Sequence, residues 1–251
     1  MISARRVAVV SDLHLGRPDA PHACNVKLDE VKAAASVLAE THDLAVVNGD
    51  LFDLERGTWP LQGREYELLS QVHAEAAAAL RAPPWIWTRG NHDRVLEALE
   101  LATEHVEVAL PCGVVRIEHG DRFNAFIKRW PPFTTFVTWV SGRVEAVPAL
   151  RPIYRAMRFA DLALTGTSRA SEDPVVTAAA EWLGTRPDLR ALVIGHTHEA
   201  VLRGLSDGRT VMNPGGSTEQ IHALSLDGEQ CLARLLRWQD GCFVEVEARP
   251  F

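Results

Sequence analysis

The sequence lacks several features that assign a chain to a class directly. No stretch approaches the roughly 20 consecutive apolar residues of a membrane-spanning helix. The apolar run at residues 7–10 is too short for the core of a secretion signal, and charged Asp12 follows it closely. Neither a Gly-x-Gly-x-x-Gly motif nor a P-loop occurs. We therefore expect a cytoplasmic protein that does not bind nucleotides through either of these loops.

Cysteine and basic charge are also scarce. The four cysteines, Cys24, Cys112, Cys231 and Cys242, form no Cys-x-x-Cys pair, so neither a zinc ribbon nor a thioredoxin-like site is expected. We expect free, mostly buried thiols, with Cys231 and Cys242 able to face each other across a C-terminal hairpin. Lys and Arg number 26 against 33 Asp and Glu, which argues against nucleic acid as a partner.

The composition that is present is that of one folded domain covering residues 1–251. Hydrophobic residues make up 47% of the chain and charged residues 24%. Short apolar, β-branched runs predict buried strands at 5–10, 44–47 and 85–88, and helices are predicted between them at 27–40 and 61–80. Strands that alternate with helices favour parallel pairing.

The pattern of predicted secondary structure changes in the second half of the chain. Residues 106–110 and 114–118 read as a hairpin, and several short strands are predicted after Thr185. These strands are expected at 191–194, 200–202, 210–212, 221–226, 231–238 and 243–247. The whole pattern predicts a mixed α/β protein with two packed sheets.

Two pairs of potential metal ligands share one spacing. Asp12 and His14 follow the first predicted strand, and His196 and His198 follow the strand at 191–194. In extended backbone, residues i and i+2 point to the same side, so each pair is expected to converge on one point. A single Asp-x-His pair is more often a turn or a surface group. Its repetition in one chain is what favours a metal site.

Further polar residues also follow predicted strands: Asp50, the neighbours Asn91 and His92, and His119. Ligand sites of open α/β sheets lie at the carboxyl ends of strands, so the five strand ends together indicate one site. Any one of these residues alone could equally be an Asx-turn or a helix cap. Carboxylate, amide and imidazole ligands without thiolate suit manganese, iron or zinc.

So many ligands imply two divalent transition metals, with manganese first and iron and zinc as alternatives. Asp50 is the best candidate to bridge the two ions. Such a pair can lower the pKa of a shared water and hold both oxygens of an in-line displacement at phosphorus.

The ordered motifs Asp12-x-His14, Gly49-Asp50, Gly90-Asn91-His92-Asp93, His119 and Gly195-His196-Thr197-His198 resemble those of the calcineurin-like metallophosphoesterase superfamily. The resemblance covers residues 12 to 198 and implies a two-sheet β-sandwich flanked by helices. It also implies that Asp50 binds both metals and that His92, with Asp50, takes a catalytic role as the acid that protonates the leaving oxygen. One metal would be held by Asp12, His14 and His198, and the other by Asn91, His119 and His196.

The longer strings around Asp12, Asp50 and His119 look closest to the UDP-2,3-diacylglucosamine pyrophosphate hydrolases of lipid A synthesis, which release lipid X and UMP. That resemblance implies a helical insertion, or cap, at residues 122–170 that covers a nucleotide-linked glycolipid. Substrate contacts would then come from Asn91, His92, Arg122 and Phe123.

The segment from Arg122 to Ala160 fits an anionic lipid by its composition. It holds seven Lys and Arg residues against Glu145 alone, with aromatic residues at roughly helical spacing. This favours a lipid substrate or peripheral contact with the inner membrane. The alternative is that the aromatic residues only seal a helical hairpin onto the core.

Two other functions stay open. The lipid A hydrolases commonly carry Arg where this chain has His92, and imidazole there is the general superfamily pattern, so a phosphodiesterase or phosphatase with a soluble substrate is the alternative. A protein-binding scaffold, such as a retromer subunit of the same fold, is the remote one, because scaffolds have incomplete metal sites and no ligand position is missing here.

Overall fold

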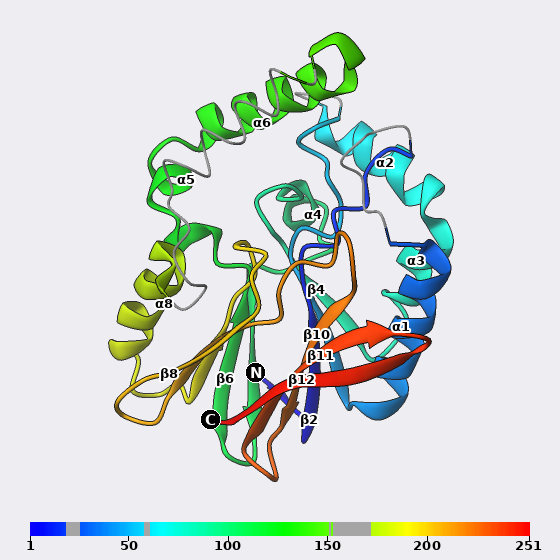
Figure 1. Cartoon of the computed structure of the whole chain (residues 1–251). Helices are drawn as coiled ribbons and strands as arrows, with labels where there is room; N and C mark the ends of the chain where they lie inside the picture. The colour runs from blue at the N-terminus through cyan, green and yellow to red at the C-terminus, as the bar shows by residue number, and fades with distance from the viewer. Residues whose placement is uncertain (19–25, 58–60, 151, 153–171) are drawn as a thin grey trace.

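Two six-stranded sheets packed face to face form the centre of the protein (Figure 1). The computed structural model describes residues 1–18, 26–57, 61–150, 152 and 172–251. The first sheet has the order β12 (Cys242–Pro250), β11 (Leu232–Gln239), β10 (His222–Asp227), β2 (Arg6–Val10), β3 (Leu44–Asn48), β4 (Trp85–Thr88). The second has the order β1 (Ile2–Ser3), β5 (His105–Leu110), β6 (Gly113–Glu118), β7 (Ala191–Val193), β9 (Thr210–Asn213), β8 (Val201–Gly204).

The parallel part of the first sheet consists of β2, β3 and β4, as their alternation with helices predicts. Val7 and Val9 of β2, with Val46 of β3, face the second sheet and pack there with Val108 and Ile117. The alternate residues of the same strands face the opposite side and pack with helices. These strands are therefore buried on both faces, which explains their unbroken apolar sequence.

Helices cover both outer faces, giving four layers (Figure 1). The first sheet is covered by α1 (Leu28–Thr41), whose Val31, Ala34 and Leu38 recur at helical spacing and are buried in a shared core. Two shorter helices, α2 (Gln62–Val72) and α3 (Ala74–Ala79), lie on the same side. The second sheet is covered by α8 (Pro174–Gly184), which begins with Pro174 at its first position and with the Asp173 side chain accepting from the Val175 N–H. The two-sheet fold class predicted from the sequence is confirmed.

Several details differ from the sequence prediction. The single helix expected at residues 61–80 is wrong, because the chain breaks between α2 and α3 at His73. The buried His73 side chain places Nε2 2.7 Å from the Gly16 carbonyl oxygen, which fixes this residue to another loop. Cys231 and Cys242 do not face each other, because they lie at opposite ends of the β11–β12 hairpin, where Gln239 pairs with Cys242 and Leu232 with Pro250.

The segment predicted as an insertion begins with a short 3-10 turn (Asp121–Phe123), followed by α5 (Ala125–Arg129) and α6 (Pro131–Ala146). These helices pass over the ends of the two sheets at the top of Figure 1, near α4 (Val95–Ala98). A second 3-10 turn follows at Pro148–Leu150. The rest of the predicted insertion, including Arg151, Arg155 and Arg158, lies outside the described residues.

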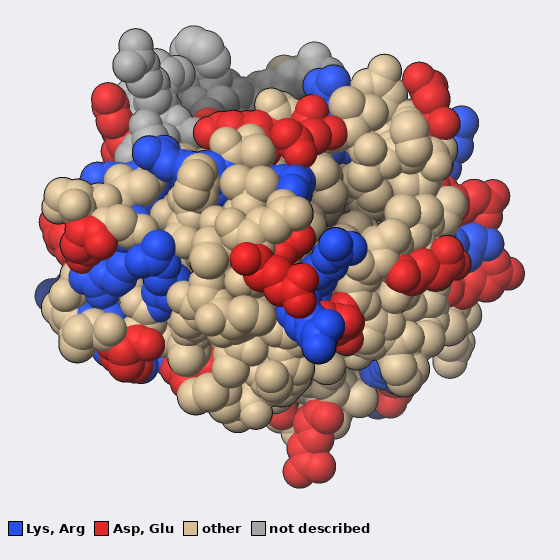
Figure 2. Space-filling view, turned by 90° about the horizontal axis from the view of Figure 1, so that it is seen from below, with Lys and Arg blue, Asp and Glu red and all other residues tan. Residues whose placement is uncertain are grey.

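Charge is mixed on the face opposite α6. Figure 2 shows Lys and Arg interspersed with Asp and Glu there, so this face presents no continuous surface of one sign. Among the described residues, no helix combines the length and the apolar character that crossing a bilayer requires.

Candidate metal centre

The loops that follow five strands meet at one end of the sandwich. The Asp12 N–H donates to the Gly49 carbonyl oxygen and the His14 N–H to that of Asp50, so the loops after β2 and β3 run side by side. The Gly195 N–H donates to the His119 carbonyl oxygen, which joins the loops after β6 and β7. These backbone bonds bring side chains that are almost 190 residues apart in sequence into one cluster.

The backbone at the cluster is left-handed rather than extended. Positive φ angles occur at Asp12 (55°), His14 (47°), Asp50 (51°), His196 (69°) and His198 (59°). Asp12 and His14 do fall in one group of potential ligands, whereas His196 and His198 fall in different groups, and the expectation that extended backbone aligns each pair on one point is wrong. Such φ values are uncommon for residues other than glycine and concentrate at functional sites.

Three side chains form the first group of potential ligands: Asp12, His14 and His198. The Nε2 atoms of His14 and His198 lie 3.2 Å apart, and His198 Nε2 lies 3.2 Å from Asp12 Oδ1. The other oxygen of Asp12 accepts from Ser11 Oγ and from the His196 N–H. Asp12 Oδ1 itself is buried and accepts no well-formed hydrogen bond among the described residues, so its lone pairs can serve a cation.

The second group contains Asp50, His119 and His196, with Asn91 beside it. His119 Nε2 lies 3.2 Å from both Asp50 Oδ2 and Asn91 Oδ1. His119 Nδ1 lies 3.0 Å from the Asn48 carbonyl oxygen, which can only accept a hydrogen bond. Nδ1 therefore carries a hydrogen, and Nε2 is the ring atom directed at the carboxylate and the amide, the orientation that a metal-binding imidazole requires.

Asp50 lies between the two groups. Its Oδ2 is 3.2 Å from His119 Nε2 on one side and 3.8 Å from His14 Nε2 on the other. Atoms bound to one ion at about 2.1 Å stand about 3.0 to 3.4 Å apart. The 3.2 Å spacings fall in this range, while His14 Nε2 and Asp12 Oδ1 are farther apart, at 3.9 Å. The donor set and the free Asp12 oxygen fit divalent cations.

Opposite charges at the cluster shift several pKa values. Burial by itself would raise the pKa of Asp50, but His119 and His92 hold it well below its usual range. Burial would lower the pKa of His119, yet the Asp50 charge and hydrogen bond raise it to about 10. Burial and the His92 charge lower the pKa of His14 to about 4. The cluster thus holds its carboxylates ionised and attracts positive charge, whether as protons or as metal ions.

His92 lies beside these two groups and forms a third group of potential ligands with Asp53 and His14, which also belongs to the first group. Its Nδ1 lies 2.9 Å from Asp53 Oδ1, and its ring packs edge-on against that of His14, with centroids 4.8 Å apart. Burial would lower the pKa of His92, but the charges of Asp50 and Asp53 raise it to about 9. The geometry therefore presents a protonated imidazole at the edge of the candidate metal site.

Sequence reasoning missed Asp53. Its carboxylate is buried and holds His92, and it also forms an ion pair with Arg56 at 3.3 Å. The signal was present, because Asp53 ends the string Gly49-Asp50-Leu51-Phe52-Asp53 and directly follows a buried phenylalanine. Asp93 was also left without a role, although its buried carboxylate accepts from the N–H groups of Gly90 and Leu51 and so ties the β3 and β4 loops together.

The helices above the cluster touch it at two points that the sequence did not predict. Asn124 caps α5 through its Oδ1, and its Nδ2 lies 3.2 Å from His196 Nε2. On the other side, Thr135 Oγ1 of α6 donates to Glu55 Oε1 at 2.8 Å, within the loop that follows Asp50. Two of the predicted substrate residues are engaged nearby: Arg122 pairs with Glu118 and Phe123 packs against Trp182.

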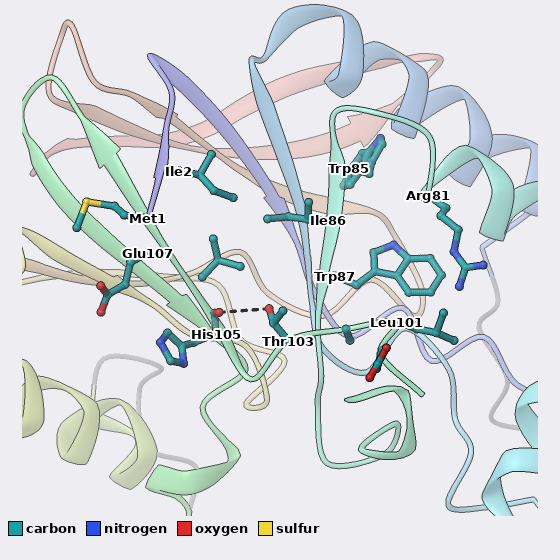
Figure 3. Close-up of a pocket in the computed structure, with 13 residues that line it drawn as sticks. Met1, Ile2, Arg81, Trp85, Ile86, Trp87, Leu101, Thr103, His105 and Glu107 are labelled. Atoms are coloured by element: carbon teal, nitrogen blue, oxygen red, sulfur yellow. Dashed lines mark hydrogen bonds between the residues drawn. The ribbon is translucent and has the colours of Figure 1, made fainter. Parts of the chain in front are cut away.

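A cavity of about 550 Å³ lies elsewhere and contains none of these residues. It follows the free edge of β4, with Trp85 and Trp87 on one side of the strand and Ile86 on the other, and extends to His105 and Glu107 of β5 (Figure 3). Since the cavity has no group of converging potential ligands among its described residues, we place the chemistry at the strand ends.

Comparisons with known proteins agree with the geometry. The family model described as calcineurin-like phosphoesterase matches residues 5–200. Vacuolar protein sorting 29 from Cryptosporidium parvum is 14% identical with a TM-score of 0.51, covering 99% of each chain, which concerns the fold alone.

Two further solved structures are similar over nearly their whole length. An archaeal phosphodiesterase is 15% identical with a TM-score of 0.44, covering 93% of this chain and 99% of that one. A predicted phosphoesterase from Streptococcus pneumoniae is 11% identical with a TM-score of 0.45, covering 99% of this chain and all of the other. No curated protein matches the chain significantly.

The backbone at Gly49 provides a test of how the cluster is built. Gly49 has a φ of +75°, and a Cβ there would come within 2.5 Å of His119 Nδ1 and 2.8 Å of Gly90 Cα. We expect Gly49→Ala to destabilise the protein by roughly 2 kcal/mol or more and to weaken metal binding. Thermal unfolding and metal titration measure both effects. The control is Gly63→Ala on α2, where a Cβ meets nothing; equal behaviour of the two variants would refute this account.

Proposed function

The chain belongs to the calcineurin-like phosphoesterase family, whose activity is metal-dependent phosphoester hydrolysis, and we propose that it uses two divalent cations to cleave a phosphodiester or a pyrophosphate. One observation carries the proposal: two buried carboxylates turn oxygen atoms toward imidazole nitrogens at 3.2 to 3.9 Å, and Asp12 Oδ1 accepts no well-formed hydrogen bond from any residue that the structure describes. Buried charges arranged in this way need compensating cations.

The proposed ligands divide as the two groups do. Asp12, His14 and His198 would hold one cation, and Asn91, His119 and His196 the other, with Asp50 between them. Oxygen and nitrogen ligands of this kind accept manganese, iron or zinc, and we propose manganese first because carboxylate and amide oxygens are well represented. When bound, such a pair lowers the pKa of a water and stabilises charge on the phosphoryl oxygens.

His92 is proposed as the general acid. Its Nδ1 is held by Asp53, so Nε2 remains to donate a proton to the leaving oxygen. Because the flanking carboxylates raise its pKa to about 9, His92 is protonated at neutral pH. Asp53 acts through His92 and is therefore a positioning residue.

The substrate class is proposed from α5 and α6. Phe126, Trp130, Phe133 and Phe136 are between 44% and 56% exposed, which supports a role for these rings beyond sealing the helices onto the core. Lys128 and Arg129 are exposed beside them. An apolar, basic surface joined to the cluster through Asn124 suits a phosphoester with an acyl chain, and UDP-2,3-diacylglucosamine at a membrane surface is the specific candidate.

A soluble phosphodiester is the second candidate, and His92 favours it. A protonated imidazole assists any leaving group with a high pKa and needs no lipid. The two candidates share the metal centre and differ only in what α5 and α6 contribute.

We expect His92→Ala to retain about two metal ions per chain and to lower kcat by roughly 10² to 10⁴ for substrates with poor leaving groups. Elemental analysis of manganese-loaded protein and turnover of alkyl phosphodiesters measure the two quantities. His42→Ala is the matched control, because His42 caps α1 and bonds Ser225 on the other side of the molecule. Loss of metal along with turnover in His92→Ala would contradict the assigned role.

Asp53→Asn should shift the pH profile. The Asp53 charge raises the pKa of His92, so its removal lowers that pKa and the protonated acid is lost at lower pH. The alkaline limb of kcat/KM should move down by about one pH unit, while metal content is unchanged. Asp188→Asn, which removes an exposed carboxylate paired with Arg186, should leave the profile in place. An alkaline limb that does not move with Asp53→Asn would exclude this role.

The substrate proposal is tested with Trp130→Ala/Phe133→Ala. For UDP-diacylglucosamine we expect kcat/KM to fall about tenfold or more, because apolar contact with the acyl chains is lost, and for bis(p-nitrophenyl) phosphate we expect no change. Leu68→Ala, which truncates an exposed apolar residue of α2, is the control. Equal rates on acylated and deacylated substrate would reject the lipid and leave the soluble phosphodiester.

A further inference from the structure

Two turns from different sheets touch at the end of the sandwich that lies away from the cluster. The β5–β6 turn contains Pro111 and Cys112, and the β10–β11 turn runs from Gly228 to Cys231. A Cβ on Gly228 would come within 2.6 Å of Pro111 Cδ and 2.9 Å of Leu110 Cβ, so the backbones of the turns are packed directly together. Both turns lie at the bottom of Figure 1.

The side chains of Cys112 and Cys231 lie within hydrogen-bond range of each other across this contact. Cys231 Sγ lies 3.9 Å from the carbonyl oxygen of Gly228, the residue that packs against Pro111. Cys112 is half-buried and packs against the core between the sheets. Burial, followed by a hydrogen bond with the Cys231 side chain, raises the pKa of the Cys112 thiol to about 11.

A backbone contact with Phe251 also holds Cys231 in place. Its φ is +50°, and its carbonyl oxygen accepts from the Phe251 N–H at 3.0 Å, with Phe251 buried in the core between the sheets. The thiol is thus presented by a fixed turn rather than by a loose loop.

We propose that Cys112 and Cys231 are a modification site at which a reversible disulfide joins the two sheets. The oxidant is a small disulfide such as oxidised glutathione. The Cys231 thiolate attacks one of its sulfurs and expels one glutathione thiolate. The Cys112 thiolate then attacks the mixed disulfide and expels the second. The two cysteines lose two electrons and two protons, and one oxidised glutathione becomes two reduced ones.

The crosslink stabilises the fold and leaves the cluster in place. It closes a loop of about 120 residues, which restricts the unfolded chain strongly. Cys112 precedes β6 and His119 follows it, so the disulfide lies about 20 Å from the candidate ligands. The proposal therefore does not depend on the proposed function.

The experiment uses full-length protein incubated with oxidised glutathione or with dithiothreitol. After free thiols are alkylated, peptide mapping by mass spectrometry should show one linkage, Cys112 to Cys231. The thermal midpoint of the oxidised protein should exceed that of the reduced protein by about 5 to 15 °C. Activity on bis(p-nitrophenyl) phosphate should agree within about twofold between the two states.

Serine variants identify the pair. Cys112→Ser and Cys231→Ser should each abolish the difference between the oxidised and reduced midpoints. Cys242→Ser should keep it, since Cys242 is exposed at the far end of the β11–β12 hairpin. If either variant fails to fold, the peptide map of the unmodified sequence decides. Glutathione adducts without a crosslink, or a crosslink through Cys24 or Cys242, would overturn the proposal.

Discussion

Burying several carboxylates within a few ångströms of one another costs free energy, and the structure around them has to offset that cost. Asp12, Asp50, Asp53 and Asp93 are all buried near the carboxyl ends of β2, β3 and β4. Isolated charges in such a place would cost several kcal/mol each. Three of them are stabilised in the ionised form by histidines, while burial and the Asp50 charge raise the pKa of Asp93 to about 7. Hydrogen bonds from backbone N–H groups, and the position of the loops at the ends of parallel strands, hold these carboxylates in place.

This arrangement explains which parts of the fold the sequence could predict. Runs such as Val7–Val10 and Leu44–Val47 are apolar throughout, which predicts strands buried on both faces, and their alternation with helices predicts the parallel pairing. The ligands that follow these strands then meet because the carboxyl ends of parallel strands lie together. The β5–β6 hairpin and the later strands were equally predictable from their turn residues.

The features that could not be predicted from the sequence depend on contacts between segments that are far apart in the chain. The break at His73 coincides with a hydrogen bond from its side chain to the Gly16 carbonyl oxygen, and helical periodicity contains no sign of this contact. The roles of Asp53 and Asn124 follow from distances to His92 and His196, which lie 39 and 72 residues away. Left-handed backbone at Asp12 and His196 was invisible for the same reason: it is imposed by bonds between loops, and neither residue type requires it.

The helices α5 and α6 are attached to the protein differently from the candidate ligands. The candidate ligands come from strand ends that both sheets fix, whereas the helices above them are tied to the cluster and its loops by polar contacts that include Asn124 with His196, Thr135 with Glu55, and Arg143 with the Gly57 carbonyl oxygen. Glu55 is buried, and its burial raises its pKa, so the Thr135 hydroxyl supplies a bond that this carboxyl would otherwise lack. Trp130 and Phe133 of these helices are about half exposed. If the proposed roles hold, exposed side chains of α5 and α6 would adjust the choice of substrate while the strand ends keep the candidate ligands in place.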